Sequence, residues 1–229
     1  MVGVEDTNAL VRFEGLSRYD TLSGRVFFKS FSQAIYPNDR ILLDGASGAG
    51  KSVFLRTLAF LDQMQEGVIY FKNEAITPKN VTYYRSQVAY VHQQAILFEG
   101  TVEENIHLPW QLKIHQGKVF DQSLLMTYLS CLEKPADFLK KSSKTLSGGE
   151  QQICHLLRTL MLNPSVLLLD EPTSALDAEA VILVENLLNH WCHQDKAWVW
   201  VSHDQGQKQR VGQQQWRIDQ ATITVGNNI

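Results

Sequence analysis

Short apolar runs with the character of strands lie towards both ends of the chain. Turn-forming residues separate the runs near the N-terminus, and the later ones are Val- and Leu-rich, as buried strands are. The predicted strand regions are residues 9–42, 68–76, 87–93, 166–170 and 198–202. The tail at 214–226 predicts a hairpin that turns near Asp219 and Gln220.

Helical spacing dominates the middle of the chain. Thr101 and Glu104 have the pattern of a capping box, so we expect a helix to begin at Val102. A second helical run, at 123–132, places four larger side chains on one side, namely Leu125, Tyr128, Leu129 and Leu132. Asp177 is a candidate cap for a helix between the last two apolar runs. Residues 94–145 therefore predict a helical insertion into a frame of alternating strands and helices.

The most informative stretch is a glycine-rich loop between a predicted strand and a predicted helix. The apolar residues 41–43 precede it, and Leu55, Leu58 and Leu61 follow at helical spacing. The loop fits G-x-x-x-x-G-K-[ST], in which backbone N–H groups surround a phosphate at the positive end of a helix. The residues of this predicted nucleotide site are Gly45, Ala46, Ser47, Gly48, Ala49, Gly50, Lys51 and Ser52. We expect Lys51 to reach the outer phosphates of a nucleoside triphosphate and Ser52 to bind Mg²⁺.

Composition narrows the classes of partner. The 229 residues carry a formal net charge of −3, which is not the basic balance of a nucleic-acid-binding protein, so we expect no nucleic-acid partner. Lys140, Lys141 and Lys144 form a small basic cluster that we expect to be a solvated face. Three cysteines without framework spacing suit a reducing compartment. Neither a signal peptide nor an apolar run of about 18 residues is present, so a cytoplasmic protein is expected.

Two adjacent carboxylates follow the predicted strand at 166–170. Asp170 could cap the next helix, but acids at the ends of parallel strands lie where ligands bind in open α/β sheets. We therefore expect Asp170 in the magnesium shell and Glu171 as the group that polarises a water against the γ-phosphate.

The segment Leu146–Glu150, LSGGE, permits two interpretations. Ser147 and Glu150 have the pattern of a capping box, which many helices carry. Gly148 and Gly149 indicate more, because they expose bare N–H groups at a positive helix end, where a phosphate binds.

LSGGEQQ resembles the signature motif of ABC-type ATPases, and the phosphate loop upstream and LLLDEPTSALD downstream extend the resemblance over nearly the whole chain. The resemblance implies that Gln93 is the glutamine that senses Mg²⁺ and the attacking water, and that His203 contacts the γ-phosphate. It also implies that Asp177 belongs to the loop crossing the dimer seam and that Tyr19 stacks on adenine.

The resemblance further implies an assembly. In relatives, Ser147 and Gly149 complete the site of the opposite subunit, so we expect two ATPase copies, most simply identical, around ATP and Mg²⁺. The expected partner is a separate membrane-spanning permease that holds the chain at the inner face of the cell membrane. The segment at 98–113, FEGTVEENIHLPWQLK, resembles ATPases paired with FetA/FetB-type iron exporters, while the cargo and the direction of transport stay open.

The predicted fold is a single ABC-type ATPase domain over residues 1–229. It comprises a P-loop NTPase core with an N-terminal antiparallel β subdomain (1–93 and 146–229) and an inserted helical subdomain (94–145). The competing classes are a soluble ABC-type ATPase acting in nucleic-acid repair or translation, and a P-loop kinase. The first usually has a long coiled-coil insertion or two cassettes in one chain, and the second has no use for LSGGE.

Two weaker features remain undecided from the sequence. His190, Cys192 and His193 could indicate a metal site, although side chains this close at a helix end more often pack at the surface. Trp110 could line the groove for a membrane partner or belong to the core.

Overall fold

The computed structural model describes residues 8–227, and the chain divides into two compact units. The first unit comprises residues 1–90, 165–170 and 192–229, and the second comprises 91–164 and 171–191. The second unit contains the whole of the range 94–145 together with two later helices. The subdomain boundaries at 94 and 145 stay a prediction.

The larger sheet of the first unit has six strands in the order β10-β9-β3-β8-β7-β6. Strand β3 runs parallel to β8 and to β9, and β8 runs parallel to β7, so four neighbouring strands share one direction. The bounds of the strands are β3 Arg40–Gly45, β6 Val88–Val91, β7 Val166–Asp170, β8 Ala197–Val201, β9 Gln214–Asp219 and β10 Thr222–Asn227. All residues of β7 and β8 are buried, as expected for central strands covered on both faces.

The smaller sheet of the first unit is antiparallel, with the order β2-β1-β4-β5. Its strands are β1 Val11–Tyr19, β2 Val26–Ile35, β4 Glu66–Phe71 and β5 Glu74–Ala75. Along β1 the alternation of buried and exposed positions is broken by irregular register, with Gly15 at a positive φ of 60°. The predicted N-terminal antiparallel strands are therefore confirmed.

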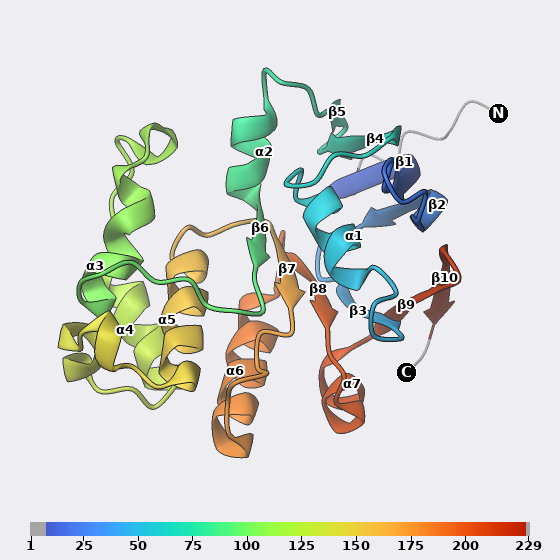
Figure 1. The fold of residues 1–229 in the computed structure, drawn as a ribbon. Helices are drawn as coiled ribbons and strands as arrows, with labels where there is room; N and C mark the ends of the chain where they lie inside the picture. Colours follow the sequence, from blue (N-terminus) through green and yellow to red (C-terminus); the bar gives the residue numbers. More distant parts are fainter. Residues whose placement is uncertain (1–7, 228–229) are drawn as a thin grey trace. The chain divides into compact units, whose positions relative to one another are not determined.

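The core of the first unit lies around α1 (Lys51–Leu58), which packs against β2 of the smaller sheet and against β3 and β7 of the larger one (Figure 1). The aromatic rings of Phe13, Phe31, Phe54 and Trp216 meet there at centroid distances of 5.4 to 6.1 Å. Edge-to-face packing of this kind adds stability beyond the burial of apolar area. Two short helices, α2 Val81–Gln87 and α7 Gln205–Val211, complete the unit.

The second unit is helical. Its α-helices are α3 Val102–His107, α4 Gln122–Cys131, α5 Gly148–Leu160 and α6 Ala178–Trp191, with short 3₁₀ turns η1 Leu108–Gln111, η2 Lys113–His115, η3 Ala136–Lys140 and η4 Ser143–Thr145. Helix α3 packs against α5, and α4 packs against α6 (Figure 1). The predicted side of α4 is buried through Leu125, Tyr128 and Leu129. Both predicted capping boxes form, at Thr101 with Glu104 and at Ser147 with Glu150.

Most of the elements predicted from the pattern are confirmed, including the C-terminal hairpin, whose turn places Gln220 and Ala221 at positive φ. The helical spacing of Leu55, Leu58 and Leu61 extends beyond the end of α1. The helix ends at Leu58 because Phe60 adopts a φ of 59°, and Leu61 is 52% exposed. Within residues 8–227 no helix is both long and apolar enough to span a bilayer.

Candidate functional site

The predicted phosphate-binding loop of the first unit follows β3 and ends at the first residue of α1. Gly45 has a φ of +147°, and a Cβ there would lie 2.6 Å from the carbonyl oxygen of Ile218 in β9, so only glycine fits. Gly50, at a φ of 104°, is the N-cap of α1 and supplies no side-chain cap. The first N–H groups of α1 are therefore uncapped by a side chain, as a phosphate site at a helix N-terminus requires.

Lys51 is folded back over this loop. Lys51 is only 6% exposed, and its Nζ donates to the carbonyl oxygens of Gly45 at 2.8 Å and Ala46 at 3.0 Å. Arg25, which precedes β2, donates to the carbonyl oxygen of Gly48. Two cations thus contact the backbone of the loop, and with its uncapped amides they fit a polyanionic ligand such as the phosphates of ATP.

A hydroxyl and a carboxylate in the first unit suit a hard cation. Ser52 stands in the first turn of α1, and Asp170 ends β7, the strand against which α1 packs. Asp170 is 3% exposed and accepts a hydrogen bond of 2.7 Å from the hydroxyl of Tyr90 to Oδ2. Oxygen donors of this kind are the ligands that Mg²⁺ prefers, so the donor set fits that ion. Asp170 does not cap the next helix, because Asp177 does so by accepting from the N–H of Ala180 at 2.9 Å.

Nothing in the sequence singles out Tyr90, the donor of the hydrogen bond to Asp170. It lies at a half-buried position of β6, the neighbour of β7. In the sequence it is marked by nothing more than a tyrosine within a short predicted strand. Burial raises the pKa of the Tyr90 hydroxyl above its ordinary range, and the hydrogen bond and negative charge of Asp170 raise it further. The hydroxyl therefore stays protonated and donates.

His203 and Asp204 follow β8, and Asp204 caps α7 by accepting from the N–H of Gln207 at 2.5 Å. From α7, Lys208 reaches back to Asp44, the residue before Gly45, with Nζ 2.7 Å from Oδ1. Partial burial acts to raise the pKa of Asp44, but the hydrogen bond and charge of Lys208 outweigh it, so the pKa lies below its ordinary value. Tyr19 ends β1 half-buried, and its N–H donates to Oε1 of Gln65 at 2.9 Å.

The second unit brings Gln93 and Glu171 together. Nε2 of Gln93 donates to Oε2 of Glu171 at 3.0 Å. Glu171 has a φ of 48°, a left-handed conformation that is unfavourable for a side chain of this size and is found at functional sites where the surroundings enforce it. The pair predicted to handle the attacking water is thus in direct contact.

Gln152 is the side chain that holds this arrangement. It is 2% exposed in α5, and its Nε2 donates to the carbonyl oxygens of Glu171 at 3.1 Å and Gln93 at 3.4 Å. Its Oε1 accepts from the N–H of Ala175 at 3.0 Å. This role of Gln152 is not predicted from the sequence. The available signal is that position 152 falls on the buried side of α5, beside Ile153 and Leu156, where an amide needs polar partners.

The N-terminus of α5 carries Gly148 and Gly149 directly after Ser147. The hydroxyl of Ser147 accepts from the N–H of Glu150 at 3.2 Å, and the Glu150 carboxylate accepts from the N–H of Ser147 at 3.1 Å. A Cβ at Gly149 would lie 3.1 Å from the carbonyl oxygen of Ala175, so this glycine lets the loop before Asp177 approach the helix. The capping interpretation of LSGGE is confirmed, and it leaves the phosphate-binding interpretation open.

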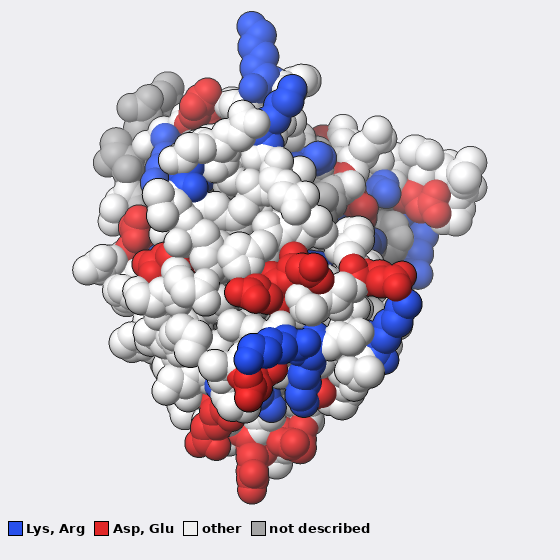
Figure 2. Space-filling model, turned by 90° about the vertical axis from the view of Figure 1, so that its left-hand side faces the viewer, with Lys and Arg blue, Asp and Glu red and all other residues white. Residues whose placement is uncertain are grey.

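The basic cluster at Lys140, Lys141 and Lys144 is exposed, and each lysine is paired with an acid. Their partners are Asp137 at 2.8 Å, Glu150 at 2.7 Å and Glu99 at 2.5 Å, respectively. Figure 2 shows one face of the molecule, on which basic and acidic side chains adjoin one another. The predicted solvated face is confirmed, and mixed charge of this kind presents no continuous basic surface.

The undecided features resolve in part. Among residues 8–227 no group of three or more His, Cys, Asp or Glu side chains is placed to hold a metal ion, and Cys192 is buried with Sγ 3.6 Å from two backbone carbonyl oxygens. Trp110 is half-buried in η1, with its ring 5.3 Å from that of Phe120. It is therefore not a core residue.

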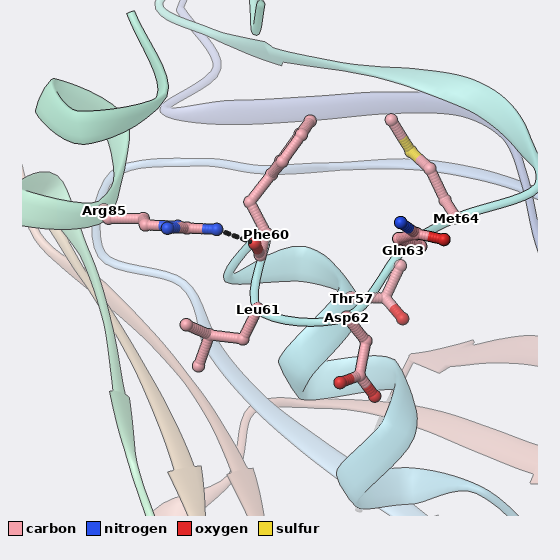
Figure 3. Close-up of a pocket in the computed structure, with 7 residues that line it drawn as sticks. All are labelled: Thr57, Phe60, Leu61, Asp62, Gln63, Met64 and Arg85. Atoms are coloured by element: carbon pink, nitrogen blue, oxygen red, sulfur yellow. Dashed lines mark hydrogen bonds between the residues drawn. The ribbon is translucent and has the colours of Figure 1, made fainter. Parts of the chain in front are cut away.

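A pocket of about 350 Å³ opens in the first unit beyond the end of α1 (Figure 3). Its lining residues are Thr57, Phe60, Leu61, Asp62, Gln63, Met64 and Arg85. Arg85 donates to the carbonyl oxygen of Phe60, while Asp62 forms an ion pair of 3.0 Å with Arg56. The pocket thus combines apolar walls with two opposite charges.

The sequence is similar to a known protein family and to individual members of it. The family model described as ABC transporter matches residues 28–174. The chain is 37% identical over 164 residues to the probable iron export ATP-binding protein FetA of Escherichia coli strain K12. The aligned region covers 71% of this chain and 72% of that protein. It is 35% identical over 216 residues to the phosphate import ATP-binding protein PstB of Mycoplasma mobile, covering 90% and 76%.

A solved structure confirms the predicted fold class. The ATP-binding cassette MJ0796, a dimer in a post-hydrolysis state bound to ADP and Pi, superposes with a TM-score of 0.79 at 24% identity, over 95% of this chain and 98% of that chain.

Proposed function

The chain belongs to the ABC transporter family as an ATP-binding and ATP-hydrolysing subunit, and we propose that it works as one of two such subunits attached to a separate membrane-spanning permease. The observation that supports this proposal most directly is the phosphate-binding loop, with its uncapped α1 N-terminus and inward-folded Lys51. Attachment to the permease would hold the chain at the inner face of the membrane.

Residues of the first unit bind and orient the nucleotide in this proposal. The loop amides and Lys51 hold the phosphates, Tyr19 stacks on the adenine, and His203 contacts the γ-phosphate. Ser52 and Asp170 of this unit would hold Mg²⁺, which neutralises charge on the phosphate oxygens when it is bound. Gln93, a residue of the second unit, is the third group that the resemblance assigns to the ion.

Residues of the second unit prepare the attacking water. Glu171 accepts a hydrogen bond from Gln93 in the structure, and a carboxylate in this position can take the proton of a water as it attacks. Ser147, Gly148, Gly149 and Asp177 would face the nucleotide of the second subunit. Each protomer is then incomplete alone, so hydrolysis depends on dimerisation.

Iron is the cargo to test first. The segment 98–113 resembles that of FetA/FetB-type ATPases, and a relative named for iron export matches at 37% identity. Reconstitution with the permease that co-purifies with the chain, followed by measurement of iron and phosphate movement into or out of vesicles, assigns both cargo and direction.

The dimer is tested with Glu171→Gln, which removes the base and keeps the shape of the side chain. We expect this variant to bind ATP with unchanged affinity, to lose most turnover and to accumulate as an ATP-bound dimer in gel filtration with light scattering. Normal turnover in this variant would refute Glu171 as the base. Full activity of the native chain at concentrations where it is strictly monomeric would refute mutual completion.

The second candidate is a soluble ABC-type ATPase of repair or translation, which the family membership by itself permits. Affinity purification of the chain from its own cells discriminates between the two. A multi-span membrane protein in the eluate supports the permease, and nucleic acid or ribosomes would replace that proposal by the second.

A further inference from the structure

The carboxylate of Asp170 is held by a hydrogen bond from outside the predicted nucleotide motifs. Tyr90 in β6 donates to Oδ2 at 2.7 Å, and the two strands are neighbours in the sheet. This bond is short and charge-assisted, and it fixes one oxygen of a carboxylate that is almost fully buried.

The chain of contacts continues beyond Tyr90. Arg56 of α1 hydrogen-bonds to the Tyr90 side chain, and it binds Asp62 through Nε at 3.1 Å and Nη2 at 3.0 Å. A guanidinium only donates, so the phenolic oxygen accepts from Arg56 and its proton is directed to Asp170. Hydrogen bonds arranged in one direction strengthen one another.

The last side chain in this series of hydrogen bonds, Asp62, lies in the wall of the pocket. Asp62 lines the cavity of about 350 Å³ beside Phe60, Leu61 and Met64, with its side chain 24% exposed (Figure 3). A continuous series of polar contacts therefore links a solvent-accessible pocket to the buried Asp170, and every member belongs to the first unit.

We propose that Tyr90 is a positioning residue for the metal-binding carboxylate of Asp170, and that the Arg56–Asp62 pair sets how firmly Tyr90 holds it. The inference rests on the proposed role of Asp170 in binding Mg²⁺. Loss of the Tyr90 hydroxyl lets the Asp170 carboxylate rotate about its side-chain torsions. Partners that orient a ligating carboxylate typically change metal affinity by 10- to 100-fold when they are removed.

The test is the gain in affinity for a non-hydrolysable ATP analogue on adding Mg²⁺, measured by titration calorimetry with Mg²⁺ and with EDTA. We expect Tyr90→Phe to reduce this gain about tenfold and to leave the affinity in EDTA unchanged. Arg56→Met should reduce the gain about threefold, and should have no further effect in the Tyr90→Phe background, because it acts through the tyrosine.

Arg85→Met is the matched control, since Arg85 lines the same pocket but donates to the carbonyl oxygen of Phe60 instead. It should leave the Mg²⁺-dependent gain unchanged. A merely structural role for Tyr90 would lower the melting temperature of the nucleotide-free chain and spare the gain, which overturns the proposal. If Tyr90→Phe does not fold, Arg56→Met alone decides, and an unchanged gain overturns the proposal.

Asp170→Asn separates the two levels of inference. If it abolishes the gain while Tyr90→Phe preserves it, the positioning role fails and the metal assignment stands. If Asp170→Asn preserves the gain, the metal assignment itself fails. Equal losses from Arg56→Met in the native and Tyr90→Phe backgrounds would refute transmission through the tyrosine.

Discussion

Replacement of Gln152 by methionine should uncouple ATP binding from hydrolysis. The variant keeps the length of the side chain and removes two donated hydrogen bonds, to Glu171 and Gln93, and one accepted from Ala175. Each well-formed bond contributes about 1 kcal/mol, and the contact at 3.4 Å contributes less, so the free energy of unfolding should fall by about 2 kcal/mol.

The effect on turnover exceeds the effect on stability because Glu171 is strained. A left-handed residue costs about 1–3 kcal/mol and persists only while surrounding contacts enforce it. Without Gln152, the backbone of Glu171 can relax and displace its carboxylate from the position proposed for the attacking water. A shift of about 1 Å at a reacting group can reduce a rate about 100-fold.

We therefore expect Gln152→Met to lower kcat about 100-fold, to change ATP affinity less than twofold, and to reduce the free energy of unfolding by about 2 kcal/mol. Steady-state ATPase assays, calorimetry and denaturant unfolding measure the three quantities. Gln151→Met is the matched control, because this adjacent glutamine of α5 donates to the carbonyl oxygen of Leu146 instead and its replacement should leave kcat within twofold. Unchanged kcat in Gln152→Met would refute the holding role.

Two further substitutions test the first unit. Lys51→Ala should weaken ATP binding at least tenfold, because it removes a cation from the phosphate loop, and equal affinity by calorimetry would refute the nucleotide site. Lys208→Met should lower the free energy of unfolding at pH 7 by about 2 kcal/mol, a buried-pair loss reduced for partial exposure. Because the pKa of Asp44 lies below its ordinary value of 3.8 in the folded chain, this contribution is present above that value and is lost as the pH falls below it. Denaturant unfolding at pH 7 and pH 3 should show the difference shrinking, and a difference independent of pH would contradict the ionic account.

The elements that the sequence predicts well are those whose determinants are local. The capping boxes at Thr101 and Ser147 require residues three positions apart, and both form as expected. The fully buried strands β7 and β8 follow from runs of apolar residues. Leu61 shows the limit of periodicity, since a backbone turn at Phe60 ends the helix where the apolar spacing continues.

The residues that the sequence does not reveal act through contacts between distant parts of the chain. Tyr90 and Asp170 are 80 positions apart, and they meet because β6 and β7 are neighbours in a strand order that no local pattern specifies. Gln152 of α5 contacts the backbone of Glu171, which lies 19 positions further along the chain, after β7. A polar side chain on a buried helix face is the one local sign of such a role, because an amide there requires partners.

The ion pair between Asp44 and Lys208 neutralises a negative charge next to the glycine-rich loop. A carboxylate directly before Gly45 places negative charge beside a loop that is proposed to bind phosphate. Lys208 neutralises that charge at 2.7 Å, and Gln215 of β9 satisfies the second oxygen at 3.2 Å. Because Lys208 lies in α7, which begins two residues after His203, the contact that removes the repulsion also fixes the helix following that histidine. The phosphate loop and the residue proposed to contact the γ-phosphate are therefore anchored to one another by the same ion pair.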